Sequence, residues 1–246
     1  MILAIVNHKG GVGRSTTAMM LGFAFTRAGR RVVLNDVDPV GTVIGWADQI
    51  HGPGESLPFS TYFYPKSHHE DWDLEEALPV VREGVPEDTV LIFDVGPRDT
   101  AGVREVAERA DFVLVPTQSS KLAFAETVRT LDGLTVPHAV VLTMGRQKGA
   151  EEIEYRQRFF DQGVYVCRTM IPYDPSIARV YGTVPTPLQG LFGYEELAGE
   201  LESCFEVLTD SAEIRRRHRA WEQEKGRSLF CGLEARLSSP AYQRPS

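Results

Sequence analysis

The sequence predicts an α/β fold: a three-layer, doubly wound and mostly parallel sheet with helices on both faces. Short apolar runs rich in β-branched residues alternate along the chain with longer segments of helical patterning. Apolar runs without polar alternation suit strands that are buried on both faces, as in a parallel sheet. A glycine-rich stretch also lies between the first apolar run and the first helical segment. Together these observations indicate parallel strands that are joined by crossover helices.

The predicted elements follow one another in a regular strand and helix order. Strands are expected at residues 2–6, 32–34, 89–93, 112–115, 139–143 and 164–166. Helices are expected at residues 15–28, 73–83, 100–109, 121–132 and 150–161. The turn-rich, aromatic stretch 51–72 interrupts this order and contains one more candidate strand at 59–63. Two helices, at 194–209 and 211–237, are expected to end the fold.

Length, charge and cysteine spacing set the broad class. The 246 residues fit one well-buried domain, which we expect to span 1–237 and to be followed by a flexible tail at 238–246. A net charge of −8 argues against a uniformly basic surface, so any DNA contact must be a local patch. The 3 cysteines are widely spaced, and no apolar run approaches the roughly 18 residues of a membrane span. We therefore expect a cytoplasmic protein.

The glycine-rich stretch "NHKGGVGRST", residues 7–16, has the composition of a phosphate-binding loop. Backbone N–H groups converge in a loop between a buried strand and a helix, and the helix dipole favours an anion there. Gly10, Gly11 and Gly13 permit the turns and the close approach that such a loop needs. Ser15 has the position from which a hydroxyl can bind Mg²⁺, and Thr16 follows it. A glycine-rich turn without a ligand is the alternative.

The segment "KGGVGRST" resembles the deviant Walker A loop of ParA/MinD-type ATPases, in particular that of ParA-like partition proteins. The pattern of that family is K-G-G-x-G-K-[ST], and the resemblance implies a P-loop NTPase fold that binds ATP or ADP with Mg²⁺. The nucleotide-binding residues that it implies here are Lys9, Gly10, Gly11, Val12, Gly13, Arg14, Ser15 and Thr16. Lys9 matches the family's second lysine, which reaches across a nucleotide-sandwich dimer to the partner's phosphates.

Arg14 departs from the family pattern, because a lysine normally precedes the hydroxyl residue. The positive charge is retained, but a planar guanidinium does not have the shape of a compact ammonium in a tight phosphate loop. Three outcomes remain open: a loop adjusted to Arg14 that still supports hydrolysis, nucleotide binding with impaired hydrolysis, or weak binding altogether.

Two carboxylates at the end of the second predicted strand form a candidate catalytic pair. Asp36 and Asp38 are two residues apart, so both side chains point to one side of an extended segment. The stretch "DVDPVG" resembles the D-x-D-P-x-G switch I segment of the same family. The resemblance implies that Asp38 promotes hydrolysis and that Asp36 supports the metal site. A turn or a helix cap is the alternative role for such a pair.

A third carboxylate, Asp94, ends the apolar run "VLIF". This is the position of a Walker B residue, which holds the water shell of Mg²⁺. The family usually continues with D-x-P-P, whereas this chain has Gly96 before Pro97. Gly96 would allow the backbone movement of a switch that senses the γ-phosphate. A plain strand-to-helix turn is the alternative.

The resemblance extends over about residues 1–190, through "VLTM" and "IPYDPSIARVYGTVP". In the family these two regions lie near the base of the nucleotide. The resemblance therefore implies four candidate residues for the adenine pocket: Met144, Pro172, Tyr173 and Asp174. The resemblance implies an ATP-dependent homodimer that positions DNA or other cargo, with slow hydrolysis stimulated by a partner protein. The catalytic residues that it implies are Lys9, Arg14 and Asp38, and the metal-binding residues are Ser15, Asp36 and Asp94.

A basic run in the last predicted helix is a candidate DNA-binding patch, and it would associate the protein with the nucleoid. It contains Arg215, Arg216, Arg217 and Arg219. Such arginines supply phosphate contacts without reading sequence, whereas a solvated helix face balanced by nearby glutamates is the alternative. Three other functions stay open: a nucleotide-binding regulator without turnover, a membrane-surface ATPase of the MinD type, and an ATP-dependent amidoligase or iron–sulfur reductase. Apolar residues near the C-terminus form a candidate membrane-surface stripe, but Gly226 and Gly232 weaken that helix and favour core packing instead.

Overall fold

The structure is a computed structural model, and it describes residues 1–50, 56–64, 86, 88–97, 106–145 and 149–225. For the last of these ranges, side chains are described up to Ser211. The chain divides into two compact units, Met1–Glu200 and Leu201–Ser246. The predicted helix at 73–83 and the predicted tail lie outside the described residues.

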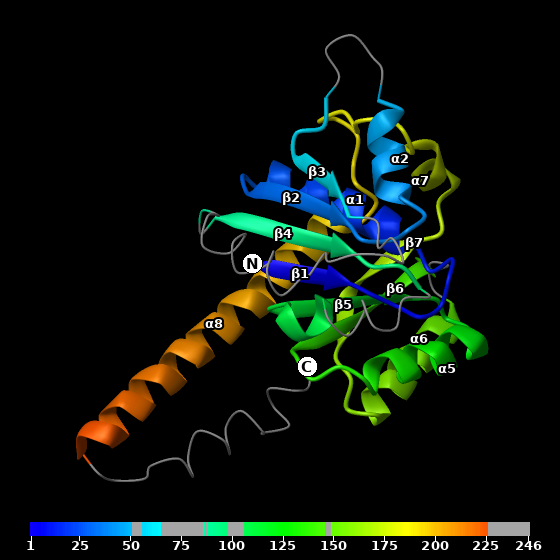
Figure 1. Ribbon diagram of the computed structural model, residues 1–246. Coiled ribbons are helices and arrows are strands. Elements are labelled where there is room, and N and C mark those ends of the chain that lie inside the picture. Colours follow the sequence, from blue (N-terminus) through cyan, green and yellow to red (C-terminus); the bar gives the residue numbers. More distant parts are fainter. Residues whose placement is uncertain (51–55, 65–85, 87, 98–105, 146–148, 226–246) are drawn as a thin grey trace. The chain divides into compact units, whose positions relative to one another are not determined.

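The first unit is built on a seven-stranded sheet with the order β3-β2-β4-β1-β5-β6-β7 (Figure 1). Every strand pairing in the described part of the chain is parallel. The strands are β1 (Ile2–Ile5), β2 (Arg31–Asp36), β3 (Ser60–Phe63), β4 (Thr89–Asp94), β5 (Phe112–Thr117), β6 (His138–Gly145) and β7 (Val166–Pro172). The predicted α/β fold with a parallel sheet is thereby confirmed, including the candidate strand at 59–63.

Helices pack against both faces of the sheet. The helices are α1 (Arg14–Arg27), α2 (Thr42–Asp48), α5 (Lys121–Leu131), α6 (Ala150–Asp161), α7 (Pro175–Arg179) and α8 (Tyr194–Lys225). Helix α1 packs on the central strands β1, β2, β4 and β5. Alternate residues of β1 enter a core that also contains Leu131 of α5 and Phe159 of α6. Successive side chains of a strand point to opposite faces of the sheet. Alternate β1 residues therefore pack against the helices on one face, and the residues between them pack against the helices on the other.

Two of the sequence predictions about helices need correction. The prediction of separate helices at 194–209 and 211–237 is wrong, because α8 is continuous from Tyr194 to Lys225. No glycine or proline lies near residue 210 to end the helix. The sequence reasoning also missed α2, a helix of only 7 residues that begins after Gly41 and lies between the second strand and the aromatic stretch. The backbone N–H groups of Val43 and Ile44 in this short helix bond to the Asp36 carboxylate.

Candidate nucleotide-binding site

The candidate phosphate-binding loop, residues 7–16, connects β1 to α1, as the sequence predicts. Gly11 and Gly13 have φ angles of 76° and 85°, in the left-handed region where a side chain is strained. Gly13 is the N-cap of α1, and no side chain caps this helix end. The first turn of α1 contains no acidic residue either. The backbone N–H groups and the positive end of the helix dipole therefore stay available to an anionic ligand.

Asn7, a buried residue that the sequence reasoning did not single out, fixes the start of the loop. Its amide nitrogen donates to the Pro116 carbonyl oxygen at 2.8 Å and to the Thr127 hydroxyl at 2.9 Å. Its amide oxygen accepts from the Lys9 backbone N–H at 2.9 Å and from the Thr130 hydroxyl at 3.3 Å. One side chain thus ties the loop to β5 and α5. A polar residue directly after a buried strand was the available signal in the sequence.

Replacing Asn7 by alanine is expected to lower the free energy of unfolding by about 2–3 kcal/mol, because buried donors and acceptors lose their partner. Nucleotide affinity is expected to fall as well, since the loop loses its anchor. Urea denaturation and a fluorescent ATP analogue measure the two effects. The matched control is Asn35→Ala, because buried Asn35 makes one long bond of 3.3 Å to the Ile92 carbonyl oxygen. Equal losses in the two variants would contradict the anchoring role.

The far side of the loop is held by residues from the ends of β5 and β6. The Thr143 hydroxyl lies 2.9 Å from the Val12 carbonyl oxygen and 3.0 Å from that of Thr117. The Gln118 amide donates to the Gly11 carbonyl oxygen at 3.0 Å. These contacts hold the loop in place before any ligand binds, so less ordering is needed on binding.

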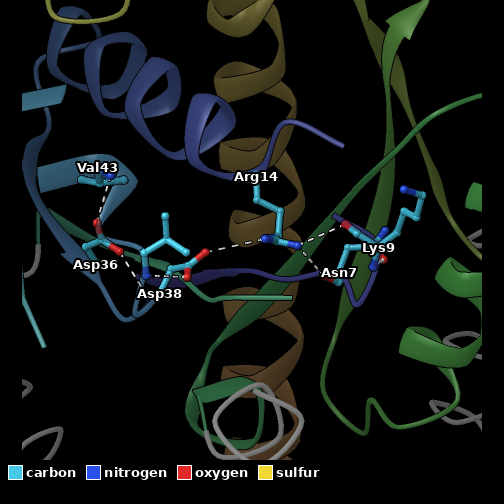
Figure 2. Close-up of polar contacts among 7 residues, drawn as sticks. Asn7, Lys9, Arg14, Asp36, Asp38 and Val43 are labelled. Carbon is cyan, nitrogen blue, oxygen red and sulfur yellow. Dashed lines mark hydrogen bonds and ion pairs between the residues drawn. The ribbon is translucent and has the colours of Figure 1, made fainter. Parts of the chain in front are cut away.

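Arg14 is the first residue of α1, and its guanidinium is turned back under the loop (Figure 2). Nη1 donates to the carbonyl oxygens of Asn7 at 2.6 Å and of Lys9 at 3.1 Å. Nη2 lies 3.8 Å from Oδ2 of Asp38, an ion-pair distance that is too long for a hydrogen bond. Burial lowers the pKa of Arg14 below its ordinary value, and the charges of Asp94 and Asp38 oppose that change. The family's lysine position is thus occupied by a cation that already has protein partners.

The Lys9 side chain points away from the Arg14–Asp38 pair (Figure 2). Its amino group donates to the Gly10 carbonyl oxygen at 2.8 Å, in an exposed setting. This contact is within the loop itself and costs little to break. The Lys9 side chain is therefore the cation of the loop that can most readily move to a phosphate.

Asp36 serves as a cap for α2. Its carboxylate accepts hydrogen bonds from the backbone N–H groups of Val43 at 2.9 Å and Ile44 at 3.2 Å, and from that of Asp38 at 3.1 Å. Burial raises the pKa of Asp36, and the three N–H groups oppose the rise. The capping role left open by the sequence is therefore present, and both oxygens are already used. Support of a metal site by Asp36 stays a prediction.

Asp38 lies where three segments of the site converge. Its Oδ1 accepts from the Val40 N–H at 3.0 Å, and its Oδ2 faces Arg14. A Cβ added to Gly96 would lie only 2.9 Å from Oδ1 and 3.4 Å from the Cα of Asp38. A glycine at position 96 is therefore required for the segment after β4 to approach Asp38 this closely. The phosphate loop, switch I and the segment after β4 all meet at one carboxylate.

Asp94 is a buried carboxylate with unused acceptors. Neither oxygen has a hydrogen-bond partner among the residues that the structure describes. Burial raises the pKa of Asp94 to about 7, and the Ser15 hydroxyl opposes this rise, while Asp36 adds to it. In the sheet Asp94 pairs in register with Asp36 of β2 and Ile5 of β1, so it lies at the same edge as the loop.

A buried carboxylate beside the Ser15 hydroxyl fits the donor set of Mg²⁺, which prefers oxygen ligands and retains part of its water shell. In the described part of the chain, no three His, Cys, Asp or Glu residues form a group that could hold a metal by themselves. A Mg²⁺ ion here would therefore depend on phosphate oxygens and water for most of its ligands.

The candidates for the base pocket lie at the carboxyl ends of β6 and β7. Gly145 pairs in register with Pro172, and the Tyr173 N–H donates to the Gly145 carbonyl oxygen at 2.8 Å. Met144 has a φ of 54° and places its methyl carbon 3.9 Å from the position of a Cβ on Gly13. Asp174 caps α7 through the Ser176 N–H at 2.8 Å. Met144 lies directly beside the phosphate loop, which suits a residue lining a nucleotide site, whereas the Asp174 carboxylate already serves α7.

The candidate DNA-binding arginines lie on α8 in the second unit, in a stretch whose side chains are not described. In the described residues, no helix has the length and apolar character needed to cross a membrane.

A family model described as the CobQ/CobB/MinD/ParA nucleotide binding domain matches residues 3–183. The chain belongs to this family. The matched region contains the loop, the three carboxylates and the base-pocket candidates. The ParA/MinD resemblance in the sequence is thereby confirmed.

The relatives include proteins with different positioning roles. The chain is 28% identical over 172 residues to maintenance of carboxysome distribution protein A of Gloeobacter kilaueensis, covering 66% of this chain and 72% of that protein. It is 58% identical over 40 residues to the chromosome partitioning protein ParA of Caulobacter vibrioides, which is 16% of this chain and 15% of the relative. A pair of uncharacterized Mycobacterium tuberculosis relatives is matched over 46% of their length.

Solved structures confirm the fold. Cobyrinic acid a,c-diamide synthase of Mycobacterium smegmatis, with bound ADP and magnesium, superposes with a TM-score of 0.63 at 21% identity, covering 83% of this chain and 95% of that one. The MinD cell division protein of Aquifex aeolicus gives a TM-score of 0.63 at 16% identity, covering 82% and 96%. At these identities the likeness is evidence for the fold alone.

Proposed function

We propose that this protein is an ATP-binding switch that dimerises around ATP and Mg²⁺, hydrolyses ATP slowly, and positions DNA or other cargo. The observation that carries the proposal is the convergence of the loop after β1, the Asp38 carboxylate and the buried Asp94 carboxylate at one edge of the sheet. A βα turn that served only the fold would not need a buried carboxylate without hydrogen-bond partners.

In the proposed mechanism, the chain's residues position the substrate and balance its charge, as is usual in phosphoryl transfer. Lys9 and Arg14 balance the charge of the β- and γ-phosphates. Ser15 and Asp94 would hold Mg²⁺, which would supply positive charge against the negative charge that develops on the phosphates. Asp38 orients the attacking water. Residues 1–237 would act as one functional domain, and Met144, Pro172 and Tyr173 would line the base pocket.

A second candidate function is a nucleotide-binding regulator with little turnover. The observation that favours it is that Arg14 already contacts two carbonyl oxygens of the loop and Asp38. These contacts occupy the guanidinium and the Asp38 carboxylate, so neither is free to act on a phosphate. The two candidates share the fold and the ligand and differ in the fate of ATP.

The cargo and the partners follow from the relatives only as proposals. One neighbour in structure, pNOB8 ParA, has been solved bound to nonspecific DNA, with a TM-score of 0.58 at 14% identity. We propose nonspecific DNA contact through the arginines of α8, a cytoplasmic and nucleoid-associated location, and a partner protein that stimulates hydrolysis. Replacing Arg215 and Arg216 by glutamate is expected to weaken DNA binding and to reduce its salt dependence.

The decisive experiment measures ATP binding and phosphate release, with and without DNA, for the native chain, Arg14→Lys and Asp38→Ala. We expect native turnover that Asp38→Ala removes while binding is retained. Tight binding without turnover in any condition would establish the regulator instead. Sedimentation with liposomes and ATP tests the membrane-surface alternative, and recovery of the protein in the pellet would favour it.

A further inference from the structure

Arg14 is shared between the phosphate loop and the switch I carboxylate. Its Nη1 donates to two carbonyl oxygens of the loop, and its Nη2 lies 3.8 Å from Oδ2 of Asp38. The Arg14 and Asp38 side chains are only 8% and 7% exposed, so solvent screens this pair little. Nε of Arg14 has no partner among the described residues, which leaves the guanidinium with unused donor capacity.

We propose that Arg14 is a positioning residue that holds Asp38 against the loop without nucleotide and releases it when phosphate takes over the guanidinium. The inference rests on the proposed nucleotide function and adds to it how the unusual arginine controls that function. In this arrangement Asp38 becomes free to orient water only after Arg14 has bound the phosphate.

The exchange follows from the charges at the site. A phosphate in the loop brings anionic oxygens close to the guanidinium and repels the Asp38 carboxylate, which has the same sign. A guanidinium forms short bidentate bonds with phosphate, whereas its present distance to Asp38 is beyond hydrogen-bond length. The bonds to the Asn7 and Lys9 carbonyls keep the guanidinium beside the loop during the exchange.

Once released, the Asp38 carboxylate keeps the hydrogen bond from the Val40 N–H on its own turn. Asp36 remains hydrogen-bonded to the start of α2, so the backbone of the turn that contains Asp38 stays in place. The carboxylate can then move without loss of the surrounding fold.

A double-mutant cycle with Arg14→Gln, Asp38→Asn and the double variant tests this inference. Without nucleotide, urea denaturation is expected to show non-additive losses of stability, because the two charges are paired. With a fluorescent ATP analogue, Asp38→Asn alone is expected to tighten Kd about three- to tenfold, because Arg14 is freed. In the Arg14→Gln background the same change is expected to leave Kd almost unchanged. Asp38→Asn should abolish turnover while it improves binding, a split that a structural role would not produce.

Asp48→Asn is the matched control, because it removes an exposed negative charge from α2 without touching Arg14. It should alter neither Kd nor the cycle. If the native chain binds and hydrolyses ATP but Asp38→Asn tightens Kd equally in both backgrounds, simple charge repulsion is the cause and the exchange is refuted. If the native chain fails to bind ATP, both the proposed function and the exchange are refuted. This holds even if the double-mutant cycle without nucleotide shows that Arg14 and Asp38 are paired.

Discussion

Asp94→Asn is expected to stabilise the nucleotide-free protein by about 2–4 kcal/mol at pH 8, although it removes a residue of the candidate metal site. Burial raises the pKa of Asp94 to about 7 from its ordinary value of 3.8. The folded chain therefore holds this proton over a pH range in which the unfolded chain has lost it. The native protein loses stability as pH rises from about 4 to 7, and the asparagine variant lacks this loss.

Urea unfolding of both proteins at pH 5, 6 and 8 measures the effect. The advantage of asparagine should be smaller at pH 5 than at pH 8 and should level off above pH 7. Asp36→Asn is the control, because the Asp36 oxygens accept three backbone N–H groups and an amide nitrogen cannot accept them. That variant should be destabilised. An Asp94→Asn protein that is less stable than the native chain at every pH would contradict the prediction.

The same substitution is expected to weaken nucleotide binding in the presence of Mg²⁺ by about 10- to 100-fold, because the metal's water shell loses a charged acceptor. Binding measured with EDTA in place of Mg²⁺ should change much less. The gain in stability and the loss of ligand binding would together identify Asp94 as a residue retained for function at the expense of the fold.

Gly96→Ala is expected to reduce ATP turnover about 100-fold without weakening the binding of ATP. The added Cβ would lie 2.9 Å from Oδ1 and 3.0 Å from Cγ of Asp38, closer than side-chain carbons come to such atoms. The carboxylate must then move away from its place between the loop and the segment after β4. A shift of about 1 Å in a group that orients water is enough for a loss of this size.

Phosphate release and binding of a fluorescent ATP analogue separate the two effects of this variant. Gly133→Ala is the matched control, because a Cβ there meets only the Thr130 carbonyl oxygen at 3.7 Å, an ordinary contact. The control should retain native turnover. Native turnover in Gly96→Ala itself would show that the position of Asp38 does not limit hydrolysis.

Most of the sheet could be predicted from the sequence because buried parallel strands are continuous apolar runs. The runs at 2–6, 89–93 and 112–115 all became strands within a few residues of the predicted bounds. Helix boundaries at the C-terminus could not be predicted as well, since α8 continues through residue 210 without a sequence break. The short helix α2 was missed because 7 residues show too little periodicity to be recognised.

The sequence by itself determined the fold, the family and the types of residue at the nucleotide site. Loop glycines, a helix-start hydroxyl and carboxylates at strand ends are local patterns, and parallel strands bring their carboxyl ends to one edge. Only the tertiary structure decided how the three carboxylates differ: Asp36 caps a helix, Asp38 faces Arg14, and Asp94 has no hydrogen-bond partner among the described residues. These differences arise from burial in the sheet, from the turn that brings α2 onto Asp36, and from the approach of Arg14 to Asp38, none of which the spacing of residues reveals.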